Sequence, residues 1–235
     1  MERDEKAKEV IKTSITVLVD DHKCVKDLLG VHGLSIYVEL LDSKEKEYGL
    51  LFDVGPSFEV LNVNSRILGI DLSTINYVFL SSLISHHSAA YFEKSSPLRK
   101  KRLLKGIPLL RSSPKENPCL DFLRSLDLGG LWRERALLIS HTKGWIALLG
   151  CSVHGLEWSL RSLYTFRNIH ALIGGLGLSE LDSFSLTSLK KFIKDKGVKM
   201  IIPLHSTSEG AKKRLSREYK DLVAKCSGAG TTITI

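Results

Sequence analysis

The 235-residue sequence contains no glutamine and only five asparagines. Depletion of these heat-labile side chains is typical of proteins from thermophiles, in which intracellular disulfides also occur. Cysteine is scarce as well, and no two cysteines form a CxxC pair. This spacing argues against a zinc knuckle and a dense disulfide framework, so we expect buried free thiols. The four cysteines are Cys24, Cys119, Cys151 and Cys226.

Long apolar runs are missing too, since none approaches the roughly 18 residues of a membrane span. The first twelve residues, MERDEKAKEVIK, are too charged for the apolar core of a secretory signal. The remaining composition, 43% hydrophobic and 26% charged, is that of a globular protein. We therefore expect a cytoplasmic protein without a membrane partner. At this length we expect one domain over residues 1–235, with a flexible segment at 1–14.

Positive charge exceeds negative charge, because 34 Lys and Arg face 26 Asp and Glu, which gives +8. The densest basic run is Arg99–Arg102 with Lys105, and a second group lies at 212–214. Aromatic residues make up only 7% and none interleaves with the basic run, which disfavours a stacking platform for single-stranded nucleic acid. We rank a phosphorylated small molecule above nucleic acid as partner. A solvated basic face is the alternative.

Apolar stretches of strand length alternate with segments of helical period. The helices are expected at 57–68, 156–166, near 188–197 and at 211–225, with Ser57 as a cap and Gly69 and Gly197 as stops. The segment 85–92 is expected to be a polar turn, and 94–130 a loop with one strand at 106–110. The strands are expected at 15–19, 34–41, 48–52, 76–83, 135–140, 145–152, 170–175, 199–204 and 231–235. Two halves that each contain sheet and helices predict an α/β (α+β) protein with an αββα sandwich.

Six motifs, in order from about Ile15 to Ile235, resemble the metallo-β-lactamase superfamily. Within this superfamily, the motifs resemble in particular the branch of the dihydropterin ribofuranosylaminobenzene phosphate synthases. It implies the αββα sandwich and, by analogy, a phosphorylated pterin-like substrate. The motifs are GLSIYVE with LLFDVG, LGIDLSTINYVFLSS, RALLISHTKGWIALLGCS, HALIGGLGL, IIPLHSTSEGAKKRL and CSGAGTTITI.

The resemblance also implies a site for two metal ions, held by a HxHxDH loop and two later histidines, that activates a shared water. Several ligand positions hold other residues in this sequence. Isoleucine and valine cannot bind metal, and serine is a poor ligand. The first metal position therefore lacks its usual ligands. The replaced positions are Ser82, Ile84, Val153 and Gly177, while His86 stands where the family has aspartate.

The second metal position keeps His87 and His205, and His86 adds a third imidazole. Three imidazoles can hold one zinc, nickel, copper or iron ion, with zinc the preferred candidate. Alternatively, no metal is bound, the adjacent histidines are ordinary surface residues, and His205 is a buried polar remnant. Asp53 resembles the residue that orients the metal loop, or is simply a turn-forming aspartate before Gly55.

Three further side chains could border the site. Ser82 and His154 are expected near the pocket, and His154 could reach the vacated first position. Cys151 could act as a nucleophile with His154, but a buried structural thiol is the simpler interpretation. Two functions from different classes follow. One is a degenerate, non-hydrolytic protein that binds a small-molecule ligand or a protein partner, and the other is a mononuclear metal-dependent hydrolase or transferase.

Overall fold

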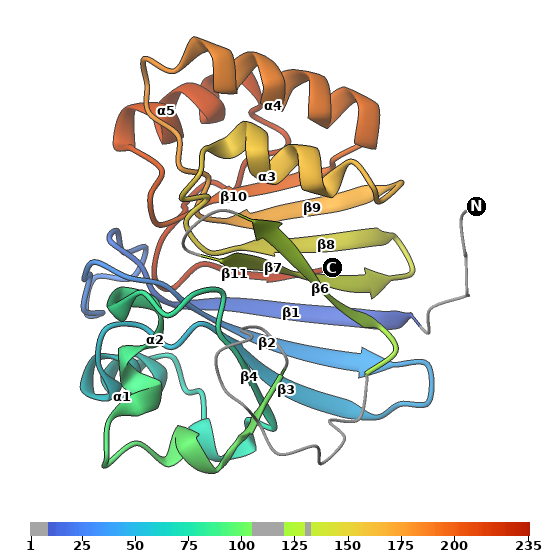
Figure 1. The fold of residues 1–235 in the computed structure, drawn as a ribbon. Helices are drawn as coiled ribbons and strands as arrows, with labels where there is room; N and C mark the ends of the chain where they lie inside the picture. Colours follow the sequence, from blue (N-terminus) through green and yellow to red (C-terminus); the bar gives the residue numbers. More distant parts are fainter. Residues whose placement is uncertain (1–8, 105–119, 130–132) are drawn as a thin grey trace.

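The structure is a computed structural model that describes residues 9–104, 120–129 and 133–235. Its amino-terminal half begins with three antiparallel strands, followed by two strands parallel to the third. Two α-helices, α1 (Phe58–Ile67) and α2 (Ser85–Phe92), pack on one side of these strands (Figure 1). The short 3₁₀ turns are Leu72–Thr74 and Pro97–Lys100. The strands are β1 (Val10–Val19), β2 (Ser35–Asp42), β3 (Glu47–Phe52), β4 (Tyr77–Phe79) and β5 (Arg102–Leu103).

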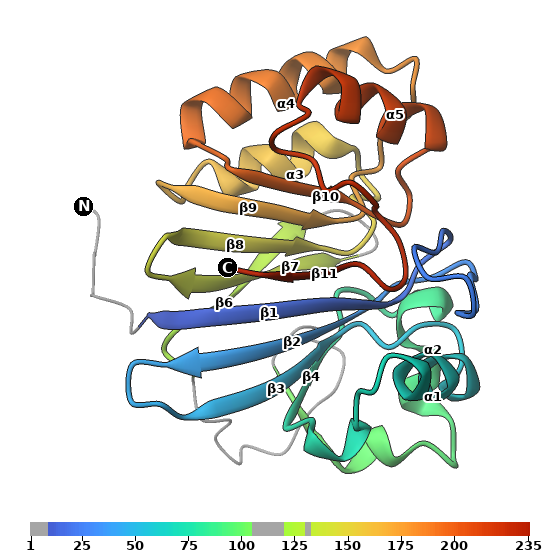
Figure 2. The ribbon, with the colours of Figure 1, turned by 180° about the vertical axis from the view of Figure 1, so that it is seen from behind.

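The carboxy-terminal half contains three antiparallel strands, then a parallel β-α-β run, and a last strand that returns to β1. Its helices lie on the opposite outer side of the molecule, as Figure 2 also shows. The helices are α3 (Leu156–Leu163), α4 (Ser183–Lys196) and α5 (Glu209–Glu218). The strands are β6 (Leu123–Gly129), β7 (Glu134–His141), β8 (Gly144–Leu149), β9 (Ile169–Gly174), β10 (Met200–Pro203) and β11 (Thr232–Thr234).

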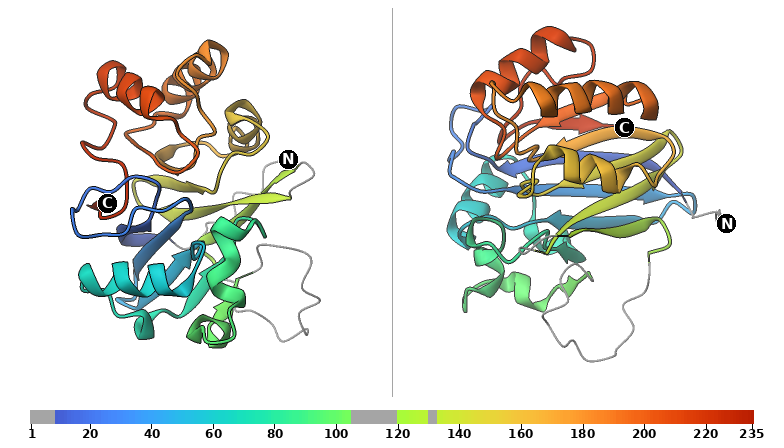
Figure 3. Two further views of the ribbon diagram at one scale, coloured as in Figure 1. Left: turned by 90° about the vertical axis from the view of Figure 1, so that its left-hand side faces the viewer. Right: turned by 45° about the horizontal axis from the view of Figure 1, so that its top comes forward.

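All these strands belong to one sheet with the order β10-β9-β8-β7-β1-β2-β3-β4-β5, in which β11 also pairs with β1 and β6 with β7. Side chains alternate between the two faces of each strand. In β8, Leu148 joins the central apolar cluster, while Ala147 and Leu149 pack beneath the carboxy-terminal helices. In β2, Val38 faces the centre and Tyr37 faces α1 and α2. Two half-sheets thus pack face to face with helices outside each, which confirms the expected αββα sandwich (Figure 3).

Local signals account for several helix ends. Ser57 accepts a hydrogen bond from the Val60 amide at the start of α1, and Gly197 ends α4 in the left-handed conformation that suits glycine. The expected turn at 85–92 is wrong, because this segment without glycine or proline forms α2 and buries His87 against the sheet. The last helix is shorter than expected, since the backbone at Val223 pairs beside Ile201 of β10.

The first strand begins at Val10 within the segment expected to be flexible, and it pairs with β2 and β11. Residues 1–8 of that expected flexible segment lie outside the described residues. The strand predicted at 106–110 also lies outside them. The loop expected at 120–129 is instead largely β6, in which Leu123 packs in the central apolar cluster and Leu128 packs beneath the carboxy-terminal helices.

The expectation of free thiols is wrong for Cys24 and Cys226, which form a disulfide across 202 residues of sequence. The carboxy-terminal segment returns to β1, and the Cys24 amide donates to the Ala229 carbonyl. This return, which the cysteine spacing cannot reveal, brings the two thiols together. Cys151 is free and buried as expected, and Cys119 lies outside the described residues.

Among residues 9–104, 120–129 and 133–235, no helix combines the length and apolar character needed to cross a bilayer.

Candidate metal centre

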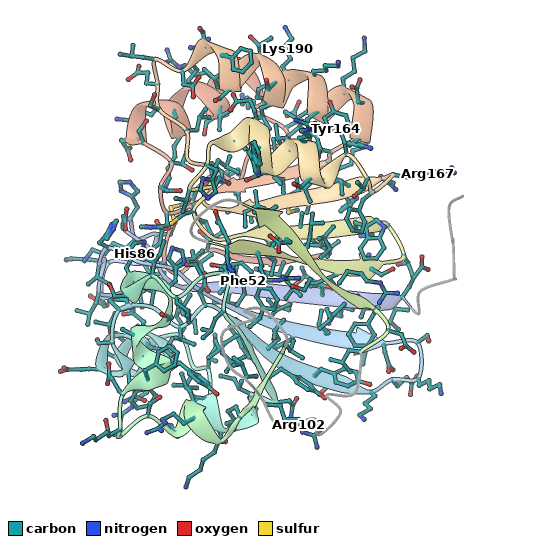
Figure 4. The ribbon with its side chains drawn as sticks, in the orientation of Figure 1. Phe52, His86, Arg102, Tyr164, Arg167 and Lys190 are labelled. Atoms are coloured by element: carbon teal, nitrogen blue, oxygen red, sulfur yellow. A yellow bond between two sulfur atoms is a disulfide. The ribbon has the colours of Figure 1, made fainter. Side chains whose placement is uncertain are left out.

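The segments that follow β1, β4, β8 and β10 meet at one edge of the sandwich (Figure 1). His86 and His87 lie in the first turn of α2. Cys151 lies in the loop that follows β8, two residues after its last residue, Leu149. His205 lies two residues after Pro203, the last residue of β10. His86 is labelled at this edge in Figure 4. Strand ends at one edge of a sheet bring together residues that are distant in sequence.

These four side chains form one cluster. One ligand atom from each of His86, His87, Cys151 and His205 lies within 4.8 Å of the others. The Cys151 Sγ atom lies 2.8 Å from His87 Nε2 and 3.6 Å from His86 Nε2. His87 is fully buried, and Cys151 and His205 are nearly so, whereas His86 is half-buried. Access to the cluster is therefore from the side of His86.

Asp53 contacts the Nδ1 atom of His87. Its Oδ2 atom lies 2.5 Å from His87 Nδ1, and both side chains are fully buried. The same carboxylate accepts hydrogen bonds from the Ser81 amide and hydroxyl, each at 2.7 Å. Asp53 itself adopts a φ of +55°, and Gly55 follows with +76°, so the tight turn after β3 directs the carboxylate inward. His87 Nε2 is thereby left facing the cluster.

A second carboxylate serves His205. Asp21 Oδ1 lies 3.0 Å from His205 Nδ1, and the neighbouring Asp20 accepts a hydrogen bond from the His205 amide at 2.6 Å. The exposed His32 ring packs 4.5 Å from His86 and 4.6 Å from His205 between ring centroids. Asp21, His32 and His205 form a second group with ligand-type atoms within 4.8 Å of one another.

The surroundings shift the pKa values of the cluster residues. Burial alone would raise the pKa of Cys151, but hydrogen bonds from His205 and His87 outweigh it and lower the pKa. Burial would likewise lower the pKa of His205, but hydrogen bonding to Asp21 and to the thiol raises it to about 9. Burial and then the neighbouring imidazoles lower the pKa of His86 to about 4. His86 is therefore a neutral imidazole at pH 7.

A buried carboxylate fixes the backbone that carries Cys151. Glu134 is 1% exposed, and its Oε1 atom accepts hydrogen bonds from the amides of Cys151 and Ser152 at 2.6 and 2.9 Å. Its Oε2 atom accepts from the Val153 amide at 2.8 Å. Three successive amides that point at one anion form a rigid loop. Glu134 therefore positions the backbone that carries the thiol.

The other expected site residues lie outside the cluster. Ser82 is buried and its hydroxyl accepts a long hydrogen bond, 3.4 Å from the Ile84 amide. His154 belongs to neither ligand group, and within the described part of the chain its buried Nε2 atom has no hydrogen-bond partner. Arg102 belongs to the basic run Arg99–Arg102, and Figure 4 shows it far from His86. Lys105 lies outside the described residues.

Sequence reasoning brought forward His86, His87, His205 and Asp53, and the structure places these four together. It missed the contact of Cys151 with two imidazoles and the positioning role of Glu134. The GCS motif at a strand end was the available signal for Cys151. Nothing local marks Glu134, because its partners lie 17 to 19 residues away.

The donor set fits a transition metal. Thiolate and imidazole suit zinc in particular, and two of the imidazoles carry a carboxylate on Nδ1, as metal-bound histidines usually do. In a tetrahedral zinc site the nitrogen and sulfur donors lie about 3.5 Å apart. The distance from His86 to Cys151 already matches, and the shorter one from His87 needs to open by less than about 1 Å. The residues present therefore fit one ion.

Comparison with models of known families finds no match, and comparison with curated proteins finds none either. Solved structures do match. Tm1679, a metal-dependent hydrolase of the beta-lactamase superfamily, aligns with a TM-score of 0.69 at 22% identity over 94% of this chain and 98% of that chain.

Two further structures are similar at lower identity. The metallo-beta-lactamase fold protein YhfI from Bacillus subtilis has a TM-score of 0.57 at 14% identity, covering 96% of this chain and 100% of that one. The short form of human tRNase Z has a TM-score of 0.54 at 12% identity, covering 94% and 98%. The chain therefore has the metallo-β-lactamase fold.

Proposed function

We propose that this chain is a metal-dependent hydrolase or transferase with a single transition-metal centre, for which zinc is the best-suited ion. The observation that carries the proposal is the convergence of His86, His87, Cys151 and His205 to within 4.8 Å. The similarity to a metal-dependent hydrolase supports the same reaction class. A bound ion of this type supplies a Lewis acid that polarises a substrate oxygen.

The chain's own residues hold and orient the centre. Asp53 and Asp21 accept the Nδ1 protons of His87 and His205, so that each Nε2 atom faces the cluster. Cys151 contributes negative charge and a soft donor. His86 is the least buried of the four donors, so the position that it would hold is the one that a substrate oxygen could reach. A catalytic centre would need such an accessible position, since a closed four-ligand site is structural.

One metal rather than two is the second part of the proposal. The positions that resemble the first-metal ligands hold Ser82, Ile84, Val153 and Gly177, and the two ligand groups found in the described residues include none of them. Neither an isoleucine nor a valine side chain can donate to a metal. The usual dinuclear water activation is thus replaced by chemistry at one ion.

The substrate class in this proposal is a phosphorylated, pterin-like small molecule. It rests on the resemblance of the six sequence motifs and on the net charge of +8, which favours an anionic ligand. A cytoplasmic location and the absence of membrane and nucleic-acid partners are part of the same proposal. They follow from composition alone.

Elemental analysis of protein purified without an affinity tag tests the metal centre. We expect about one equivalent of transition metal, lost in a His86→Ala, His87→Ala double variant and kept in a His22→Ala, His170→Ala control. Cobalt substitution adds a second readout, because a cobalt–thiolate charge-transfer band should disappear in Cys151→Ser. Hydrolysis of generic phosphoesters and lactones should depend on the metal.

Folded protein that is metal-free and cannot be reloaded would overturn the proposal. The degenerate, ligand-binding or partner-binding protein would then be the correct interpretation, and His205 would be a remnant. Metal binding without any turnover would retain the centre but assign it a structural role.

A further inference from the structure

A basic groove lies beside the metal centre, between α5 and the loop that follows β1. Its volume is about 670 Å³. Five cationic side chains and one carboxylate, Glu209, line it, so the groove carries a clear positive excess. His22 also lines it and lies 3.4 Å from Glu209. The cations are Lys23, Lys212, Lys213, Arg217 and Lys225.

One of these cations is buried, which distinguishes the groove from an ordinary solvated face. The side chain of Lys212 is only 10% exposed. Its Nζ atom donates to the Ser227 carbonyl at 3.0 Å and lies 3.5 Å from Asp20 Oδ1. A lysine ammonium carries three N–H donors, and within residues 9–104, 120–129 and 133–235 these two contacts leave one for a ligand in the groove. Burying a lysine is costly unless its charge is used or paired.

The remaining cations differ in how many of their donors are already bonded within the protein. Lys23 donates to the carbonyls of Lys26 and Leu28, so its charge adds to the field while its donors are largely occupied. Lys213 lies 3.6 Å from Glu209 and is 69% exposed, which makes that ion pair weak. Lys213, Arg217 and Lys225 are all exposed, so their charged groups can turn toward an anion without a loss of core packing.

The groove has rigid walls. Cys226 lines it and is joined through its disulfide to Cys24, in the loop that carries Asp20 and Asp21. Asp20 also links the groove to the metal centre, because one carboxylate oxygen meets Lys212 and the other accepts the His205 amide. A ligand that binds Lys212 is therefore separated from the backbone of His205 by a single side chain, that of Asp20.

We infer that this groove binds the phosphate group of a phosphorylated small molecule. Compact ammonium groups suit a phosphate dianion, and the positive excess exceeds what a single carboxylate ligand would need. Among the described residues that line the groove there is no Phe, Tyr or Trp on which a nucleobase could stack, so nucleic acid is the weaker candidate. The inference refines the substrate class of the proposed function, but phosphate binding itself does not require that a metal is bound.

Binding of inorganic pyrophosphate to the chelator-treated full chain tests the inference, by calorimetry at 0.15 M salt. The variant is Lys213→Ala, Arg217→Ala, Lys225→Ala, which alters exposed side chains only. The control is Lys190→Ala, Lys191→Ala, Lys194→Ala on α4, which removes the same charge outside the groove. We expect affinity to fall at least tenfold in the groove variant and less than threefold in the control. Circular dichroism checks that each variant is folded.

Three outcomes would overturn the inference. They are no pyrophosphate binding by the unaltered chain, equal weakening in both variants, and tighter binding of a single-stranded oligonucleotide that the groove variant abolishes. Because the chelated protein is used, these results are independent of the metal assay. If the protein binds metal but not pyrophosphate, only the assignment of the groove is wrong. If it binds pyrophosphate but no metal, only the proposed metal centre is wrong.

Discussion

The Oδ2 atom of Asp53 lies 2.5 Å from Nδ1 of His87, and neither side chain is exposed to solvent. A buried carboxylate behind an imidazole fixes its tautomer and makes Nε2 a better metal ligand. Asp53→Asn should therefore lower metal affinity roughly 10- to 100-fold. Competition with a chromogenic chelator measures it. The exposed Asp71→Asn serves as the control, and an unchanged affinity in Asp53→Asn would contradict the role.

Glu134 should control the position of Cys151. Glu134→Ala leaves the buried amides of Cys151 and Ser152 and the half-buried amide of Val153 without this acceptor, at about 1–3 kcal/mol for each buried amide when nothing replaces it. We expect a loss of about 3–5 kcal/mol in the free energy of unfolding, together with a weaker cobalt–thiolate band. Glu134→Gln, which retains one carbonyl acceptor, should lose less. The surface variant Glu218→Ala should change either readout little. An intact band in a folded Glu134→Ala protein would refute the positioning role.

The disulfide should contribute strongly to stability. It closes a loop across 202 residues, for which the chain-entropy model gives about 5 kcal/mol and measured values are typically about 2–4 kcal/mol. Cys24→Ser with Cys226→Ser should therefore lower the free energy of unfolding by about 2–5 kcal/mol in urea titration. A reductant should have a similar effect on the unaltered chain and none on the double variant. Equal stability of oxidised and reduced protein would contradict this expectation.

The pair formed by Asp21 and His205 should make stability depend on pH in metal-stripped protein. The pKa of His205 is raised to about 9 from 6.5, so its contribution is complete below pH 6.5 and is lost as the pH rises through 9. The pKa of Asp21 is lowered to about 2 from 3.8, although burial alone would raise it, because hydrogen bonding to His205 dominates. Its contribution is present above pH 3.8 and is lost as the pH falls through 2.

Both contributions therefore hold between about pH 4 and 6.5. Asp21→Asn should lower the free energy of unfolding by about 1–2 kcal/mol at pH 5.5, a figure reduced because the Asp21 side chain is 34% exposed. The loss should be smaller at pH 9.5. The exposed Asp27→Asn should show no such difference between the two pH values. A larger effect of Asp21→Asn at pH 9.5 than at pH 5.5 would reverse the assigned sign.

Much of the fold could be predicted because its signals are local. The apolar run 145–149 indicated a strand buried on both faces, and Leu148 and Leu149 do pack into opposite clusters. Ser57 and Gly197 act on helix ends a few residues away. Some predictions failed where a distant partner decided the local conformation. Residues 219–225 leave the helical conformation because Val223 pairs beside Ile201.

The sequence by itself determined the layered sandwich and the candidate histidines, because alternation, capping and motif order depend on neighbouring residues. Only the tertiary structure decided that Cys151 contacts His87, that Cys24 meets Cys226, and that Lys212 is buried against Asp20. These pairs are 64 to 202 residues apart in the chain. Their contacts exist because strand ends converge at one edge of the sheet, and a spacing along the sequence does not encode that convergence.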